Sequence, residues 1–408
     1  MVRKGATNAG ERAARAAAGG AGTRDADDSG DLDDMGDAAD ATGEAGDAAL
    51  TAFAHPEGRR GRGSRSNRSG RFEGLERLRL DDGWGALDAP PPPLRTFVAI
   101  DATRTIITRN ASPDISFDRS INPYRGCEHG CIYCFARPTH AYLGLSPGLD
   151  FESRLFAKPD AAALLEGELR APNYACAVIA IGTNTDPYQP IERRFQVMRQ
   201  VLEVLAACEH PVGITTKSAL IQRDIDILAA MAEKRLVKVA LSITTLDRDL
   251  ARAMEPRAAT PARRLETLAA LHEAGIPTCV MVAPIIPGLT DWEIERILEA
   301  AAAAGVSEAG YVLLRLPLEI ADLFQEWLAD AVPDRARRVM KLLRQMREGK
   351  DYDSAFGRRM VGRGPLAALI NQRFHLAARR LGINRARLVL DTGRFRPPPR
   401  AGDQMSLF

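Results

Sequence analysis

The sequence predicts an α/β protein in which helices cover a parallel sheet. The main observation is that short apolar segments alternate with amphipathic ones from residue 116 to residue 330. Apolar strands that are each followed by a helix are typical of a parallel sheet buried on both faces. A second observation is that polar side chains gather where several of these strands end, and parallel α/β proteins carry their chemistry there.

Six strand–helix units can be placed along the chain. A first strand is expected at 116–122, directly before a cysteine-rich loop. The later strands are expected at 175–182, 212–216, 237–243, 278–284 and 310–316. The helices are expected at 159–170, 191–208, 222–233, 261–274, 291–304 and 320–330. This order predicts six βα units whose carboxyl strand ends meet on one side.

The polar side chains at these strand ends differ from the apolar strands before them. The segment 183–186, with the sequence Thr-Asn-Thr-Asp, follows the second strand. Thr216 and Lys217 follow the third strand, and Ser242 ends the fourth. Packing alone does not explain polar groups at successive strand ends, so we expect them to form one site.

Residues 1–92 are expected to be a disordered, low-complexity tail. The segment 25–47 carries many carboxylates and no basic residue, and the segment 59–71 is rich in Arg, Gly and Ser. Such a composition buries too little apolar surface to offset the entropy lost on ordering. The arginine-rich segment could contact nucleic acid, although a solvated tail is the simpler interpretation. The folded domain is therefore expected to span 93–330.

Composition limits the class of protein. Hydrophobic residues make up 45% of the chain, which is enough for a large core, and the net charge of +2 does not itself imply a polyanionic partner. No apolar run reaches the length of a membrane span, and the N-terminal residues lack the apolar stretch of a secretory signal. Six clustered cysteines are too few for a disulfide framework, so a reducing compartment, the cytoplasm, is expected.

Three cysteines, Cys127, Cys131 and Cys134, lie in one loop after the first strand. Gly126 and Gly130 allow the backbone to turn tightly there, so the three thiols can converge. Converging thiolates repel one another unless a soft cation binds them. The loop is therefore expected to bind a metal ion or an iron–sulfur cluster.

Two interpretations of this loop remain open from the residues alone. A structural zinc would take His129 or His140 as its fourth ligand. A cubane iron–sulfur cluster would keep one iron open for another ligand, because no fourth cysteine lies nearby in the sequence.

The cysteine spacing, with the aromatic Tyr133 before the last cysteine, is the signature of the radical SAM superfamily. Further segments resemble one branch of it, which is related to spore photoproduct lyase and called DNA repair photolyase-like. The resemblance covers roughly residues 97–390 and implies a partial (β/α)6 radical SAM barrel. The segments that carry it are 127–134, 182–192, 216–218 and 283–288.

The resemblance implies a role for each matching residue. Cys127, Cys131 and Cys134 would hold a [4Fe-4S] cluster, and S-adenosyl-L-methionine would chelate its open iron. A reducing electron donor would supply the electron that cleaves the sulfonium, and the resulting 5′-deoxyadenosyl radical would abstract hydrogen from a substrate. Tyr133 would lie near the adenine of the cofactor. The amino end of its methionine would be contacted by Asn184, Thr185 and Asp186. Lys217 would pair with the methionine carboxylate, and Ser242 would bond to the same end of the cofactor.

Two departures from spore photoproduct lyase bear on the reaction. That enzyme carries a cysteine hydrogen donor at or beside the position of Thr183, and a tyrosine at the position of Phe135. A hydroxyl holds its hydrogen far more tightly than a thiol, so Thr183 cannot replace that donor. The reversal of a thymine photoproduct is therefore not assigned, and the catalytic residue is unknown.

Three functions are compatible with the sequence. The first is a radical SAM enzyme that repairs or modifies DNA, the second acts on RNA or a protein side chain, and the third is a non-enzymatic iron–sulfur or zinc adaptor.

The segment 331–393 is expected to be a helical, arginine-rich extension that could contact the DNA backbone. Its arginines are Arg358, Arg359, Arg363, Arg373, Arg379, Arg380, Arg385 and Arg387.

The segment 394–408 is expected to be a flexible tail that carries a docking peptide. Its residues Gln404, Met405, Ser406, Leu407 and Phe408 resemble the pentapeptide with which bacterial DNA polymerases and repair proteins bind the sliding clamp. Methionine in place of leucine fits, because methionine fills apolar pockets adaptably. The resemblance implies recruitment to the bacterial sliding clamp and favours DNA as the substrate.

Overall fold

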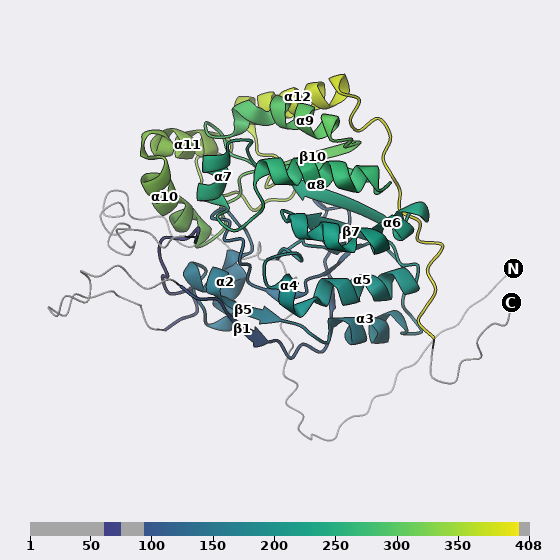
Figure 1. Cartoon of the computed structure of the whole chain (residues 1–408). Helices are drawn as coiled ribbons and strands as arrows, with labels where there is room; N and C mark the ends of the chain where they lie inside the picture. Colours follow the sequence, from purple (N-terminus) through teal and green to yellow (C-terminus); the bar gives the residue numbers. More distant parts are fainter. Residues whose placement is uncertain (1–60, 75–93, 400–408) are drawn as a thin grey trace, which may run out of the picture.

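The computed structural model describes residues 61–74 and 94–399 (Figure 1). Within these residues the main sheet has seven strands in the order β10-β9-β8-β7-β6-β3-β2. Only β2 among them is antiparallel to its neighbour, and the other six run parallel. The strands are β2 (Ile107–Arg109), β3 (Arg119–Ile121), β6 (Ile179–Ile181), β7 (Val212–Thr216), β8 (Val237–Ser242), β9 (Thr278–Ile285) and β10 (Glu308–Leu313). The predicted α/β fold with six parallel strands is confirmed.

Helices surround the outside of these strands (Figure 1). They are α3 (Ala161–Leu169), α5 (Val197–Ala207), α6 (Ile225–Glu233), α8 (Pro261–Glu273), α9 (Ile294–Ala303) and α10 (Ile320–Ala331). Their apolar faces pack on the strands and form one core, because strand side chains that point outward need a cover. The space inside the strands opens at their carboxyl ends.

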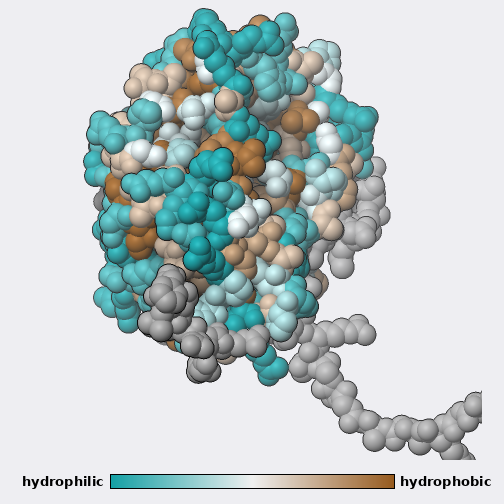
Figure 2. All heavy atoms as spheres, turned by 90° about the vertical axis from the view of Figure 1, so that its right-hand side faces the viewer, coloured by the Kyte–Doolittle hydropathy of each residue, from teal (hydrophilic) through white to brown (hydrophobic). Residues whose placement is uncertain are grey.

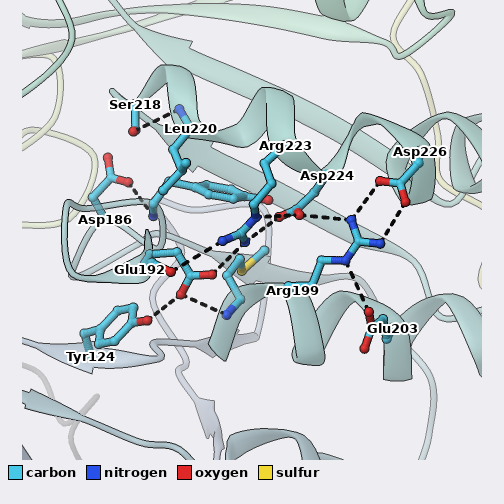
Figure 3. Close-up of polar contacts among 12 residues, drawn as sticks. Tyr124, Asp186, Glu192, Arg199, Glu203, Ser218, Leu220, Arg223, Asp224 and Asp226 are labelled. Atoms are coloured by element: carbon cyan, nitrogen blue, oxygen red, sulfur yellow. Dashed lines mark hydrogen bonds and ion pairs between the residues drawn. The ribbon is translucent and has the colours of Figure 1, made fainter. Parts of the chain in front are cut away.

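Several elements depart from the predicted bounds. The helix expected at 191–208 is divided into α4 (Glu192–Phe195) and α5, and Gln196 between them has φ 51°. The reason is the buried carboxylate of Glu192, whose Oε2 accepts a hydrogen bond from the backbone N–H of Met198 in the first turn of α5 (3.1 Å) and another from the hydroxyl of Tyr124 (Figure 3). The helices expected at 222–233 and 291–304 begin as the 3-10 turns η2 (Ala219–Asp224) and η3 (Asp291–Glu293), and the helix α7 (Arg248–Met254) has no counterpart in the prediction.

A smaller sheet lies beside the cysteine loop. It consists of β1 (Phe97–Ile100), β4 (Tyr124–Arg125) and β5 (Arg154–Ala157), with β5 in the middle. The 3-10 helix η1 (Arg137–Leu143) and the short α2 (Leu149–Ser153) connect the loop to β5. The loop is therefore held between two sheets.

Residues 61–74, here called the strap, pack against the domain. Ser64 is fully buried, and the strap arginines pair with carboxylates at and on α10: Arg68 with Glu326 (2.8 Å) and Arg71 with Glu319 (2.8 Å). The expectation of a solvated tail is wrong for these residues, because carboxylates far along the chain neutralise the arginines. The rest of the expected tail, 1–60 and 75–92, lies outside the described residues.

The chain after the barrel forms two further helices and then crosses the sheet. The helices are α11 (Pro333–Gln345), which packs on α10, and α12 (Gly364–Arg380), which packs on α9. The segment 384–396 then passes the amino ends of the strands (yellow in Figure 1), where the backbone N–H of Asp391 bonds to Arg235 (3.0 Å) and that of Arg396 to Cys208 (2.9 Å). The flexible tail expected from 394 onward is thus anchored as far as Arg396, and the peptide 404–408 lies outside the described residues.

Many arginines of the extension are already paired, which weakens the expected DNA-binding face. Of the eight arginines named in the prediction, five contact carboxylates within the described residues. The pairs are Arg358 and Arg363 with Glu348, Arg359 with Asp114, Arg373 with Glu295, and Arg380 with Glu299. A guanidinium that is neutralised inside the protein contributes less to binding a polyanion.

The outer surface shows no sign of a membrane-spanning element. Among the described residues, no helix is both long and apolar enough to cross a bilayer. Hydrophilic residues dominate the face in Figure 2, and hydrophobic residues lie between them in small groups.

Candidate active site

One cavity of about 300 Å³ opens at the carboxyl ends of the strands. All nine residues predicted as ligands or cofactor contacts line it, which confirms that the polar strand ends meet there. They are Cys127, Cys131, Cys134, Tyr133, Asn184, Thr185, Asp186, Lys217 and Ser242. The individual roles given to them in the sequence analysis remain predictions.

The cysteine loop is wound tightly by backbone hydrogen bonds. The N–H of Gly130 donates to the carbonyl of Cys127 (3.3 Å), and that of Cys134 donates to Cys131 (3.2 Å). Gly126 and Gly130 have φ 72° and 66°, so they adopt the left-handed conformation that the sequence predicts for this turn. The three thiols therefore reach one wall of the cavity.

The electrostatics of this wall suit a cationic group. Burial raises the pKa of Cys127 well above its ordinary value, and Asp186 and the other two thiols raise it further. Burial, together with Glu255 and Cys134, raises the pKa of Cys131 to about 12 against the opposing effect of Lys217. A positively charged iron–sulfur group would hold these thiols as thiolates. Among the described residues, no three His, Cys, Asp or Glu side chains are arranged to hold a single metal ion.

The histidines of the zinc alternative are engaged elsewhere. His140 does not line the cavity, and its Nε2 lies 2.9 Å from the carbonyl oxygen of Arg154. His129 lines the cavity, but its Nδ1 lies 3.3 Å from a carboxylate oxygen of Asp186. The donor set that faces the cavity is thus three cysteines, which fits a cluster with one open iron.

A buried ion pair holds the loop from behind. Arg137 donates to the carbonyls of Cys131 (2.9 Å) and Gly130 (3.1 Å) and pairs with Glu152, and both side chains of the pair are fully buried. Glu152 also accepts the backbone N–H groups of Gly63 (2.9 Å) and Ser64 (2.8 Å) from the strap. A pair so buried needs these further hydrogen bonds to offset its desolvation. The strap therefore completes the support of the cysteine loop.

The strap approaches the loop so closely that only glycine fits at one position. A Cβ atom built on Gly63 would lie 1.8 Å from the carbonyl oxygen of Gly130. The backbone of the strap thus lies directly on the cysteine loop, which the composition of this segment did not reveal.

Asp186 connects the strand ends to the loop. Its carboxylate accepts the hydroxyl of Thr216 (2.7 Å), the N–H of Lys217 (2.7 Å) and His129. Burial alone would raise the pKa of Asp186, but His129 and these two donors lower it to about 2. Figure 3 shows Asp186 beside the turn that holds Ser218 and Leu220. Asp186 thus positions its neighbours, and protein groups satisfy both of its oxygens.

The other predicted cofactor contacts differ in whether protein groups already bind their polar atoms. The Thr185 hydroxyl donates to the carbonyl of Tyr124 (2.9 Å), so it also braces the backbone. The Tyr133 hydroxyl is held by Glu255 and Thr244. Lys217 instead extends its Nζ to 5.7 Å from the centre of the Tyr133 ring. Among the described residues no carboxylate pairs with Lys217.

Sequence reasoning missed several groups that shape the site. Gln189 joins the loop to the second strand end, since its Oε1 accepts the N–H of Glu128 (2.9 Å) and its Nε2 donates to Gly126 (3.1 Å). The sequence signal that could have identified Gln189 is its position in the segment 182–192, which carries part of the family resemblance. Phe117, Arg315 and Met360 also line the cavity. These residues lie far apart in the chain, and no local pattern marks them.

The comparisons with known proteins agree with this geometry. The Radical SAM superfamily model matches residues 121–301. An uncharacterised protein of Mycobacterium tuberculosis (strain ATCC 25618 / H37Rv) is 40% identical over 233 residues, which are 57% of this chain and 68% of the relative. The chain belongs to the radical SAM superfamily. An uncharacterised protein of Methanocaldococcus jannaschii is 29% identical over 42% of this chain and 62% of its own length.

Among solved structures, a variant of spore photoproduct lyase has a similar fold. Its TM-score is 0.52 at 16% identity, with 70% of this chain and 80% of that chain covered. This likeness confirms the predicted barrel. Members of the superfamily are enzymes that use a [4Fe-4S] cluster and S-adenosylmethionine. The three cysteines of the loop are the residues here that would hold the cluster.

Proposed function

We propose that the protein is a radical SAM enzyme that acts on damaged or modified DNA. The observation that carries the proposal is that the three loop thiols and the side chains of Asn184, Lys217 and Ser242 line one cavity. When bound there, the cluster and S-adenosylmethionine supply one-electron cleavage of a sulfonium and a carbon radical that abstracts hydrogen. A reduced electron donor must deliver the electron.

The chain's own residues would bind and orient the cofactor. A zwitterionic amino acid needs a cation for its carboxylate and an acceptor for its ammonium on a rigid scaffold. Lys217 provides the cation, and the Asn184 side chain and the Ser242 hydroxyl provide acceptors beside it. Asp186 and Thr185 would bind beside them, and their hydrogen bonds to Thr216, Lys217 and Tyr124 would hold them in place.

The reaction is proposed to differ from that of spore photoproduct lyase. Thr183 and Phe135, the two positions that depart from that enzyme, both line the cavity. Of the described residues that line this cavity, the cysteines are Cys127, Cys131 and Cys134 of the loop. A closing step that needs a thiol hydrogen donor is therefore not proposed. Modification of RNA or of a protein side chain is the second candidate.

The test is anaerobic reconstitution with iron and sulfide, followed by incubation with S-adenosylmethionine and dithionite. About four irons per chain and formation of 5′-deoxyadenosine are expected. Deuterium transfer from labelled DNA, but not from labelled RNA or protein, into 5′-deoxyadenosine would identify the substrate class. Iron uptake without 5′-deoxyadenosine would favour the adaptor function.

We also propose that residues 404–408 bind the bacterial sliding clamp, on the resemblance of their sequence. The last described residues lie near the amino ends of the strands, where the ring of Phe395 packs on His210 and Tyr174. This anchor is at the end of the barrel opposite the cavity, so clamp binding would leave the cavity open. Such recruitment agrees with a DNA substrate and with the cytoplasm, where thiols stay reduced.

The clamp proposal is tested by titrating the full-length protein against a bacterial clamp. A micromolar dissociation constant is expected, which corresponds to roughly −8 kcal/mol. The double variant Leu407→Ala and Phe408→Ala removes both apolar anchors and should abolish binding. Binding that persists in this variant, or is absent from the wild type, refutes the clamp proposal without touching the radical SAM assignment.

A further inference from the structure

Arg315 lines the cavity at the end of β10. It shares this lining with Phe135, Leu313 and Met360. Lys217 and Ser242, by contrast, stand at the ends of β7 and β8. A substrate that enters beside the cofactor would therefore meet Arg315.

Arg315 differs from its neighbours in the groups that contact its guanidinium. Its guanidinium donates to the hydroxyl of Tyr352 (3.0 Å) and approaches the sulfur of Met360 (3.6 Å), and its buried Nε has no partner among the described residues. The other arginines near the loop differ: Arg137 pairs with Glu152 and Arg264 pairs with Glu255. Within the described residues, no carboxylate pairs with Arg315.

A second guanidinium adds to this positive charge. Arg347 is 1% exposed and donates to the backbone carbonyls of Leu314 (2.9 Å) and Arg358 (2.9 Å). Burial and the nearby Arg315 lower the pKa of Arg347 to about 10, against the opposing effects of Tyr352 and Asp353. Arg347 lies behind the wall and Arg315 lines it, so an anion bound at Arg315 would also be attracted by a second positive charge.

Aromatic rings flank the same guanidinium. Its Cζ lies 5.2 Å from the ring centre of Phe135 and 5.7 Å from that of Tyr352. Phe135 directly follows the third loop cysteine, and 41% of its surface is exposed. An exposed ring beside an arginine is the combination that binds a base and a phosphate of single-stranded nucleic acid.

We propose that Arg315 binds a phosphate of a single-stranded or locally opened DNA substrate, while Phe135 stacks on the adjoining base. The reacting groups lie inside a cavity at the strand ends, and enzymes that act on a base take it out of the stack to bring it into such a cavity. This inference rests on the proposed function and names the residues that would select the substrate. It places the stacked base next to the cysteine loop.

The test is fluorescence anisotropy with a labelled single-stranded thymidine oligonucleotide and the anaerobically reconstituted protein at several salt concentrations. Arg315→Gln should weaken binding roughly tenfold, and it should reduce the slope of log affinity against log salt by about 0.7. Arg315→Lys should keep the slope, because it keeps the charge. Phe135→Leu should weaken binding roughly tenfold without changing the slope.

The matched control is Arg296→Gln. Arg296 is exposed on α9, outside the cavity, and stacks on the ring of Trp292 (5.7 Å). The substitution Arg296→Gln therefore also removes a positive charge beside an aromatic ring. It should leave both affinity and slope unchanged. Iron content and S-adenosylmethionine binding, measured for each variant, should equal those of the wild type.

The outcomes separate this inference from the proposed function. Equal affinity and slope in Arg315→Gln and Arg296→Gln would overturn the phosphate site. A wild type that forms 5′-deoxyadenosine but does not bind the oligonucleotide would also overturn it and leave the radical chemistry intact. Oligonucleotide binding that depends on Arg315 without any 5′-deoxyadenosine would support the site and refute the proposed reaction. If Arg315→Gln does not fold, a changed slope in Arg315→Lys overturns the proposal.

Discussion

The two ends of the sheet are built from similar residue types but serve different purposes. At the carboxyl ends, Asp186, Thr216 and Lys217 line a cavity, and within the described part of the chain no carboxylate pairs with Lys217. At the amino ends, the comparable Lys238 pairs with Glu308 (2.8 Å), and the segment 384–396 covers the strands. Polar groups thus face a ligand site at one end and satisfy one another at the other. The difference shows that an unpaired charge in a cavity indicates function more sharply than a polar residue at a strand end.

The largest expected difference between the ends concerns two cysteines. Cys131→Ala, at the carboxyl end, should abolish iron uptake and 5′-deoxyadenosine formation, because a cluster needs all three thiolates. Cys176→Ala, before β6 at the amino end, should leave both unchanged. Iron analysis and product chromatography check this. Stable uptake of one zinc and no iron by the wild type would contradict the assignment.

The support behind the cysteine loop should have the next largest effect. Glu152→Gln leaves the buried Arg137 without its anionic partner and should lower the free energy of unfolding by about 3–5 kcal/mol. Glu319→Gln, which only weakens the outer strap contact with Arg71, should cost no more than about 1 kcal/mol. Denaturant unfolding of both variants is the measurement, and equal losses would show that the strap does not act through Glu152.

The two lysines give a third test of the comparison. Lys217→Ala should weaken S-adenosylmethionine binding by about 2–5 kcal/mol without loss of iron, because it removes the cation proposed to pair with the carboxylate of the cofactor. Lys238→Ala should leave this affinity unchanged and lower stability by about 1 kcal/mol, since its ion pair with Glu308 is partly exposed. Equilibrium binding and iron analysis check both variants. Loss of iron in Lys217→Ala would indicate a folding role instead.

At the amino end of the sheet, a buried histidine should make the stability of the fold depend on pH without affecting cofactor binding. Burial lowers the pKa of His210 from 6.5 to about 4, so the folded state holds its neutral form. This contribution to stability is complete above about pH 6.5 and is lost as the pH falls toward 4, by at most about 3 kcal/mol. His210→Gln should flatten the pH profile of unfolding between these values. A pH profile identical to that of the wild type would contradict the prediction. Part of the pH dependence should remain in the variant, because burial also lowers the pKa of His140 to about 4.

The sequence alone determined the strands, their parallel order and the nine residues at the carboxyl end. These features are local in the chain: the alternation of apolar segments defines the strands, and the cysteine spacing and the 183–186 segment follow directly from two of them. Once the strands run parallel, their ends must meet, so the site was predictable without knowing the side-chain contacts.

The tertiary structure alone decided which distant segments complete the site. The strap lies on Gly130 and Glu152 although its composition predicts a solvated tail, and the wall of Phe135, Arg315 and Met360 joins three separate parts of the chain. The tertiary structure also shows that Asp186, which the resemblance places beside the cofactor, accepts hydrogen bonds from Thr216 and Lys217 and contacts His129. Whether a charge is neutralised depends on which carboxylates packing brings beside it, and no local spacing records that.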